Sequence, residues 1–257
     1  MQDRSIAFIG GGNMATSLIG GLVAAGWRPS TITVAEPDAA KRDTLSQRFG
    51  VVTVEEAPEA ITGKAMVVLA VKPQILAEVA RELGPSLAGA EHPPLVMSVA
   101  AGIPLERLRT WLGENIPLVR VMPNTPALVG SGVSALYAEP DVDADGRAAA
   151  EAVMGAAGAT VWVPKEAHMD TVTAVSGSGP AYFFLVLEAL EEAAVAEGLD
   201  RETARTLAIE TARGAGDLAA ADDEAPAVLR ARVTSPGGTT AQGVAALERG
   251  GLRTTLA

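Results

Sequence analysis

A glycine-rich turn near the N-terminus constrains the fold of this chain more than any other feature. Apolar residues at 6–9 favour a β-strand, Gly10, Gly11 and Gly12 follow them, and a helix-permissive run comes next. Gly10, Gly12 and Ala15 have the G-x-G-x-x-A spacing with which a strand–turn–helix unit binds the pyrophosphate of a dinucleotide. The turn is therefore predicted to bind such a cofactor, unless it is only a structural turn.

The residues of this turn have different structural roles. The first glycine allows the tight turn, the second lets the backbone approach the pyrophosphate, and Ala15 allows close packing of helix on strand. The start of the helix adds unpaired N–H groups and a partial positive charge. The predicted cofactor contacts of this segment are Ile9, Gly10, Gly11, Gly12, Asn13 and Met14.

Strand-like and helix-like segments alternate along the first part of the chain. Apolar β-rich runs lie at 6–9, 31–35, 51–54, 66–71, 95–99 and 117–122, and helical patterns lie near 13–25, 38–48, 74–83 and 105–112. Such alternation is typical of an α/β fold with a doubly wound parallel sheet. Two further β-like runs, at 133–137 and 160–163, are expected to extend it. We predict an N-terminal Rossmann-like domain over residues 1–164.

Ligands of such sheets bind beyond the carboxyl ends of the strands, so the residues that follow each strand are candidates. Glu36 follows the second strand, where an acidic residue commonly binds the ribose 2′-OH of NAD. Lys41 and Arg42 lie nearby and would suit the 2′-phosphate of NADP, so the choice between NADH and NADPH stays open. The other predicted cofactor contacts at strand ends are Ala70, Val71, Lys72, Pro73, Ala100 and Ala101.

The character of the sequence changes after Pro164. Residues 165–257 contain no convincing strand, and helices are predicted near 165–196, 201–220, 227–233 and 239–249. The first of these is long and mostly apolar, as at many dimer seams, and Pro180 should kink it because proline removes a helical N–H. We therefore predict an all-helical C-terminal domain over residues 165–257.

The amino-acid composition limits which ligands and which kinds of catalytic chemistry can be expected. The formal net charge of -11 opposes binding to nucleic acid or to an anionic membrane, so we expect a small-molecule ligand. The chain has no cysteine and only two histidines, which excludes thiolate chemistry and makes a metal site improbable. The N-terminal residues lack a signal pattern, and no uninterrupted apolar run reaches the roughly 20 residues that span a bilayer. We expect a cytoplasmic protein.

A second cluster of glycines and hydroxyls lies at residues 234–240, directly before an amphipathic helical pattern. A helix start of this kind binds anions, and because the nucleotide has its own site, the second anion would be a substrate carboxylate. The alternative is an ordinary Ser/Thr cap with a Pro-Gly turn.

Six segments together resemble the pyrroline-5-carboxylate reductase family, in the family's order and over nearly the whole chain. They lie at residues 10–14, 70–74, 98–102, 122–126, 176–182 and 233–240. The resemblance implies the last step of proline biosynthesis, in which NAD(P)H reduces 1-pyrroline-5-carboxylate to L-proline. It also implies that the helical domain interleaves with a second subunit to form a homodimer, and that dimers commonly assemble into decamers.

The resemblance also implies roles for the C-terminal loop. The Thr240 hydroxyl would contact the ring nitrogen of the substrate and assist its protonation, which makes Thr240 the candidate catalytic residue. Lys72 and Pro73 would line the nicotinamide half of the cofactor site. Because the cofactor carries the hydride, the reaction needs no thiol or metal. The implied substrate contacts are Val233, Ser235, Gly237, Gly238, Thr239 and Thr240.

The chain departs from the family pattern in three places. Family members usually continue past residues 250–253 into a final helix, many have an adenosine-binding asparagine where this chain has Glu55-Glu56-Ala57, and Ala225-Pro226 replaces a common His-Pro pair. The details of oligomer packing and of adenosine binding are therefore not carried over.

Two other functions would fit part of this sequence. The β-hydroxyacid dehydrogenases have a similar glycine turn, and resemblance to them would imply a catalytic lysine on the long helix. This chain has no lysine after Lys165, which argues against that function. A noncatalytic nucleotide-binding regulator would not need the intact loop at 235–240. Turnover of pyrroline-5-carboxylate distinguishes both from the reductase.

Overall fold

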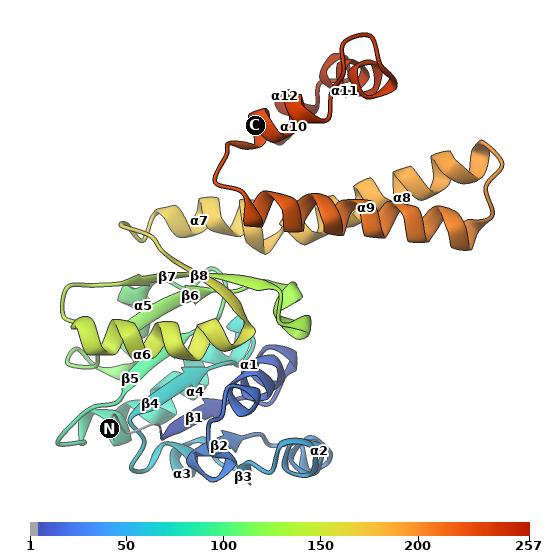
Figure 1. The fold of residues 1–257 in the computed structure, drawn as a ribbon. Coiled ribbons are helices and arrows are strands. Elements are labelled where there is room, and N and C mark those ends of the chain that lie inside the picture. The colour runs from blue at the N-terminus through green and yellow to red at the C-terminus, as the bar shows by residue number, and fades with distance from the viewer. Residues whose placement is uncertain (1–4) are drawn as a thin grey trace. The chain divides into compact units, whose positions relative to one another are not determined.

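The computed structural model describes residues 5–257, and Figure 1 shows their helices and strands. The chain divides into two compact units, one ending at Tyr182 and one comprising Phe183–Ala257. The division lies inside one long helix. The predicted domain boundary, between residues 164 and 165, lies in the short segment that connects the last strand to this helix. It stays a prediction.

The first unit is built on one eight-stranded sheet with the order β3-β2-β1-β4-β5-β6-β7-β8. The strands from β1 to β6 pair in parallel, which confirms the predicted doubly wound α/β sheet. The strand order reverses at β1, which lies between β2 and β4, and ligands of such sheets bind at this reversal. The strands are β1 (Ile6–Ile9), β2 (Ile32–Ala35), β3 (Val52–Val54), β4 (Met66–Leu69), β5 (Leu95–Ser98), β6 (Leu118–Met122), β7 (Gly132–Ala138) and β8 (Gly158–Trp162).

Strands β7 and β8 extend the sheet as expected, but β7 runs antiparallel to β6. The connection between β6 and β7 contains only a short 3-10 turn, η2 (Thr125–Val129), and no crossover helix. A short connection can return the chain only in the opposite direction, whereas parallel strands need a longer crossover. The run of apolar residues in β7 could not reveal this direction.

Helices cover both faces of the sheet. One apolar core contains side chains of α1 (Asn13–Ala24), α2 (Ala39–Phe49) and α6 (Ala144–Met154), and the other contains side chains of α3 (Ala57–Ile61), α4 (Pro73–Ala88) and α5 (Leu105–Leu112). Successive residues of β1 enter opposite cores, as strand geometry requires. Helix α3 was not predicted, because five residues are too few to show helical periodicity. The remaining short turns of this unit are η1 (Pro29–Thr31) and η3 (Gly155–Ala157).

Helix α1 packs very closely on η3. A Cβ atom built on Gly21 would lie 2.0 Å from the carbonyl oxygen of Ala156, whereas one built on the neighbouring Gly20 would lie 3.2 Å from the ring of Phe49. The first contact is with backbone and the second with a side chain. Gly21 is therefore required for this packing, and Gly20 is not.

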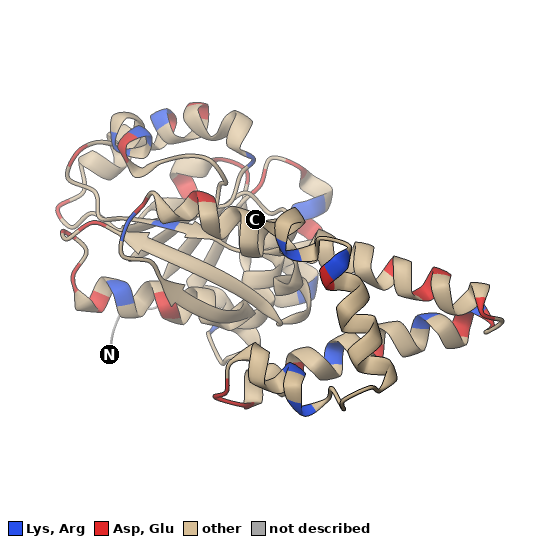
Figure 2. Cartoon of the chain, turned by 90° about the horizontal axis from the view of Figure 1, so that it is seen from above, with Lys and Arg blue, Asp and Glu red and all other residues tan. Residues whose placement is uncertain are grey.

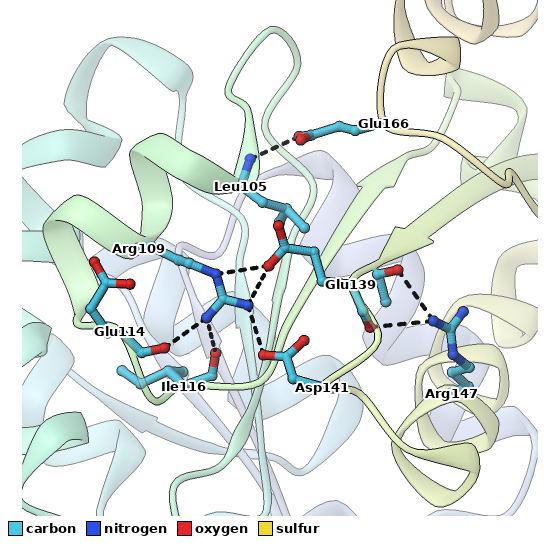
Figure 3. Close-up of polar contacts among 9 residues, drawn as sticks. Leu105, Arg109, Glu114, Ile116, Glu139, Asp141, Arg147 and Glu166 are labelled. Carbon is cyan, nitrogen blue, oxygen red and sulfur yellow. Dashed lines mark hydrogen bonds and ion pairs between the residues drawn. The ribbon is translucent and has the colours of Figure 1, made fainter.

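Arg109 ties α5 to the loop after β7, as Figure 3 shows. Its guanidinium donates to the carboxylate of Glu139, to Oδ2 of Asp141 at 2.7 Å and to the carbonyl oxygen of Glu114 at 2.8 Å. Burial opposes the charge of Arg109, but the hydrogen bonds to Asp141 and Glu139 outweigh it and raise its pKa above the ordinary value. These contacts hold the carboxyl-terminal side of α5 in place.

One irregular helix follows β8 and continues into the second unit. It consists of α7 (His168–Val172), a π-helical turn, η4 (Thr173–Gly177), and α8 (Gly179–Ala196). In this wide turn the Ser178 N–H donates to the Thr173 carbonyl at 2.8 Å, and a kink at Pro180, which lies in the first turn of α8, stays a prediction. The Asn124 amide braces the turn, because its Nδ2 donates to the Ser176 carbonyl at 3.1 Å while its Oδ1 accepts from the Val133 N–H at 2.9 Å.

Among residues 5–257, the segment His168–Ala196 is the one helix that is long and apolar enough to cross a bilayer by length and composition alone. This helix is not an uninterrupted apolar run in the sequence, because serine, threonine and glycine residues interrupt it. Its end carries the carboxylates of Glu188, Glu191 and Glu192.

The second unit contains the rest of α8 and the helices α9 (Arg201–Ala221), α10 (Pro226–Arg232), α11 (Thr239–Arg249) and α12 (Leu252–Leu256). All but α12 were predicted. Arg201 and Arg205 of α9 bind Glu191 of α8 at 2.7 and 3.0 Å. Hydrogen bonds from Arg205 and Arg201 lower the pKa of Glu191 below its ordinary value.

The helices of the second unit bury few of their own apolar side chains. Phe183, Phe184 and Leu185 are 63–68% exposed, and the buried apolar residues of this unit are Ala204 and Ala208. Figure 2 shows acidic and basic residues interspersed along the helices, with long uncharged stretches between them. A unit with so little core of its own leaves a large apolar surface exposed, and such surfaces mark interaction sites.

Candidate functional site

A pocket of about 500 Å³ lies at the carboxyl ends of β1, β2 and β4, where the strand order reverses. Seven of the predicted cofactor contacts line it: Ile9, Gly10, Gly12, Glu36, Ala70, Val71 and Lys72. The other lining residues are Ala35, Pro37, Lys41, Glu55, Glu56, Ala57, Ile75, Val79 and Glu82. The remaining predicted contacts, which are Gly11, Asn13, Met14, Pro73, Ala100 and Ala101, are not among the lining residues. Contact of any of these residues with the cofactor stays a prediction.

Some of the additional lining residues could have been found from the sequence. Glu55, Glu56 and Ala57 follow β3 directly, so the rule that ligands bind at strand ends applies to them as well. Ile75, Val79 and Glu82 lie on one face of α4 at helical spacing. No local signal distinguishes that face from the others, because only the packing of α4 against the sheet turns it toward the pocket.

The turn requires glycine at position 10. Gly10 has φ +100°, and a Cβ atom built on it would lie 3.0 Å from both the Ala70 carbonyl oxygen and Cγ1 of Val71. The Gly10 N–H donates to the Ala35 carbonyl at 2.8 Å, and the Ala70 N–H donates to the Ile9 carbonyl at 2.8 Å. The turn is thus held between the ends of β2 and β4, with no space for a side chain.

Gly12 is in a different situation. It caps α1 with an ordinary backbone conformation, φ -71° and ψ -175°, and a Cβ atom built on it would meet no atom within 4 Å. The fold therefore does not need glycine here, and the space beside the helix start is available to a ligand. The first N–H groups of a helix lack intrahelical partners, and the first turn of α1 contains no acidic residue. These features fit the pyrophosphate of a dinucleotide.

The carboxylate of Glu36 is built into the same turn. The residue is 6% exposed, and its Oε2 accepts from the Gly11 N–H at 2.9 Å while its Oε1 accepts from the Asp38 N–H at 3.2 Å. Nζ of Lys41 lies 3.8 Å from Oε1. Glu36 therefore has a structural role that its position in the sequence did not reveal, in addition to lining the pocket.

Arg42 braces the segment after β2 and does not line the pocket. Its Nη1 donates to the carbonyl oxygens of Glu36 and Pro37, both at 2.8 Å, and its Nη2 donates to Oε2 of Glu55 at 3.1 Å. These contacts engage both terminal nitrogens of the guanidinium within the protein.

The other predicted site lies in the second unit, between α10 and α11. Val233 ends α10, Gly238 caps α11, and Thr239 and Thr240 begin that helix. The Gly238 N–H donates to the Ser235 carbonyl at 3.1 Å, and Gly237 has φ +74°. Among the described residues the Thr240 hydroxyl has no hydrogen-bond partner. The loop thus combines a helix start with a free hydroxyl group.

Within residues 5–257 there is no group of three or more His, Cys, Asp or Glu side chains that could hold a metal ion.

Two family models match the chain. Residues 166–257 match the model described as pyrroline-5-carboxylate reductase dimerisation, and residues 5–102 match the model described as NADP oxidoreductase coenzyme F420-dependent.

Curated relatives match over nearly their full length. The pyrroline-5-carboxylate reductase of Pseudomonas aeruginosa is 45% identical over 251 residues, which cover 98% of this chain and 91% of the relative. The corresponding enzyme of Arabidopsis thaliana is 39% identical, with 99% and 91% covered.

Solved structures agree with the sequence relatives. The pyrroline-5-carboxylate reductase of Coxiella burnetii has a TM-score of 0.95 at 41% identity, covering 99% of this chain and 94% of that one. The pyrroline carboxylate reductase of Plasmodium falciparum, solved with NADP bound, has a TM-score of 0.85 at 29% identity, with 100% and 94% covered. The fold, the glycine turn with its pocket, and these similarities lead to one conclusion: the chain belongs to the pyrroline-5-carboxylate reductase family.

Proposed function

We propose that the protein is an NAD(P)H-dependent pyrroline-5-carboxylate reductase that produces L-proline in the last step of proline biosynthesis. The observation that carries the proposal is the dinucleotide pocket at the end of β1, in a chain that matches reductases of this name over almost its whole length. When bound, the reduced nicotinamide supplies the hydride that reduces the C=N bond of the substrate.

The residues of the first unit bind and orient the cofactor. Gly12 and the start of α1 hold the pyrophosphate, with Gly11, Asn13 and Met14 contributing from the same turn. Glu36 binds the adenosine ribose. The nicotinamide half is lined by residues at the ends of β4 and β5, which are Ala70, Val71, Lys72, Pro73, Ala100 and Ala101. The support for this assignment is that the pocket joins Gly12, Glu36 and Lys72.

The loop before α11 binds the substrate. Ser235, Gly237, Gly238 and Thr239 hold the carboxylate at the start of this 11-residue helix, and Val233 contributes the preceding wall. The Thr240 hydroxyl contacts the ring nitrogen and assists its protonation. Its position in the first turn of α11, next to the loop that holds the carboxylate, supports this role.

The helical C-terminal domain, residues 165–257, forms a homodimer. The exposed Phe183, Phe184 and Leu185 support this proposal, because a second subunit would remove them from water. Dimerisation also accounts for the apolar character of the helix His168–Ala196 without a bilayer. Assembly of dimers into decamers, a cytoplasmic location, and the lack of nucleic-acid and membrane partners belong to the same proposal.

The test is turnover of pyrroline-5-carboxylate by the purified protein with NADH and with NADPH, followed by the loss of reduced cofactor. Failure to turn over with either cofactor, in protein shown to be folded and dimeric, would refute the reductase function and favour a noncatalytic nucleotide-binding protein.

The role of Thr240 is tested separately. Thr240→Ala should lower kcat by about 100-fold, as for loss of a group that assists proton transfer. Thr240→Ser keeps the hydroxyl and should keep most of the activity. Full activity of the alanine variant would remove the assignment of Thr240 and leave the function itself intact.

A further inference from the structure

We propose that this protein selects NADH over NADPH, and that the buried carboxylate of Glu36 is the residue that excludes the 2′-phosphate. The inference rests on the proposed function and adds cofactor specificity to it. It depends on three observations: the fixed position of Glu36, the engagement of Arg42, and the charges that line this end of the pocket.

Glu36 cannot easily move away from the pocket. Its two carboxylate oxygens accept hydrogen bonds from the N–H groups of Gly11 and Asp38, and rotation of the side chain would break both. A carboxylate has about four lone-pair sites, so the two backbone contacts leave room for a bond from a ribose 2′-OH. A neutral 2′-OH can donate such a bond, whereas a 2′-phosphate has only acceptors and negative charge to offer.

The nearby arginine is not free to compensate. A guanidinium is the side chain best suited to bind a phosphate, because its planar fork matches the phosphate oxygens. In this protein the fork of Arg42 donates to the Glu36 and Pro37 carbonyl oxygens and to the Glu55 carboxylate. A contact with a 2′-phosphate would require the loss of these bonds.

The remaining charges are mostly negative. Glu36, Glu55 and Glu56 line the pocket beside the ends of β2 and β3, and Lys41 is the cation that lines it there. Lys41 lies 3.8 Å from Glu36 and its side chain is 56% exposed, so water screens it more strongly than the buried carboxylate. A phosphate with a charge between about -1.5 and -2 is therefore repelled at this position.

The first experiment compares NAD+ and NADP+ binding to the wild-type protein by isothermal titration calorimetry, and kcat/KM for NADH and NADPH with pyrroline-5-carboxylate. We expect NADP+ to bind at least about tenfold more weakly than NAD+, because like charges in a partly buried site repel strongly. The kcat/KM values should differ in the same direction. Equal binding, or tighter binding of NADP+, would overturn the proposal.

Glu36→Gln tests the residue itself. Glutamine keeps the size of the side chain and one oxygen that accepts from the Gly11 N–H, but it removes the charge. The NADP+ to NAD+ ratio of Kd values should fall by about tenfold, mainly through tighter binding of NADP+. Glu59→Gln is the matched control, because Glu59 lies exposed on α3 outside the pocket lining, and its ratio should equal that of the wild type.

The possible outcomes test the cofactor specificity and the reductase function independently of each other. An unchanged ratio in folded Glu36→Gln would show that another group discriminates, and would overturn the role of Glu36. If that variant does not fold, the wild-type ratio decides by itself whether the pocket excludes the 2′-phosphate. Preferential NAD+ binding without any turnover would support the specificity and refute the reductase function.

Discussion

Replacing Gly10 or Gly12 of the N-terminal turn by alanine should affect different properties of the protein, its stability in the first case and its cofactor binding in the second. Gly10→Ala places a methyl group 3.0 Å from the Ala70 carbonyl oxygen and from Cγ1 of Val71, at a φ of +100°. Gly12→Ala places the same methyl group where no protein atom lies within 4 Å, at a φ of -71°. We expect the first substitution to destabilise the fold and the second to block the cofactor.

The expected changes in the free energy of unfolding follow from these two environments. A non-glycine residue at positive φ costs about 1–2 kcal/mol, and an extra methyl in a filled site costs about 1–3 kcal/mol, so Gly10→Ala should lower the free energy of unfolding by about 2–5 kcal/mol. At Gly12 the smaller entropy of the unfolded chain stabilises by about 0.4–1 kcal/mol, and a poorer N-cap costs roughly as much. The net change for Gly12→Ala should therefore be close to zero.

Unfolding in urea and calorimetric titration of NAD+ are both measured, at one protein concentration because the stability of an oligomer depends on concentration. Gly12→Ala should unfold at the wild-type urea concentration and bind NAD+ at least about tenfold more weakly, because the methyl group occupies the space needed by the pyrophosphate. Wild-type affinity in Gly12→Ala would refute the pyrophosphate site. A loss of stability equal to that of Gly10→Ala would refute the structural distinction.

Three further predictions test contacts away from the cofactor. Gly21→Ala should lower the free energy of unfolding by about 3 kcal/mol because its methyl would overlap a backbone carbonyl, while Gly20→Ala should change it by less than about 1 kcal/mol, both measured by urea unfolding. Asn124→Ala should cost about 1–3 kcal/mol in the same assay, because the partly buried Val133 N–H and Ser176 carbonyl lose their partner. The hydrogen bonds from the two arginines of α9 lower the pKa of Glu191 below 4.5, so their contribution to stability is present above that pH and is lost as the pH falls through the lowered value. Melting temperatures measured across this acid range should therefore fall more steeply in the wild type than in Glu191→Gln, and parallel curves would contradict the contact.

The local sequence determined much of the fold because the signals that define its elements are local. Five of the six apolar runs that predict β1 to β6 are followed by a glycine, a proline or a charged residue, and every strand begins and ends within two residues of its prediction. Helix α11 begins and ends where its pattern does, at Thr239 and Arg249. The glycine spacing also identified a turn that lines the pocket, since close backbone approach requires glycine at specific positions.

Only the tertiary structure decided which side chains meet in the pocket and what each of them does there. The direction of β7, the face that α4 turns toward the pocket, and the partners of Glu36 and Arg42 depend on contacts between residues that local patterns do not relate. Glu36 illustrates the difference. Its place after β2 predicted a contact with ribose, but both Glu36 and Arg42 are bonded within the protein, and only the structure shows that Glu36 lines the pocket while Arg42 does not. The sequence therefore predicted which turn binds the dinucleotide, whereas the packing of the loop after β2 decided how Glu36 and Arg42 are held there.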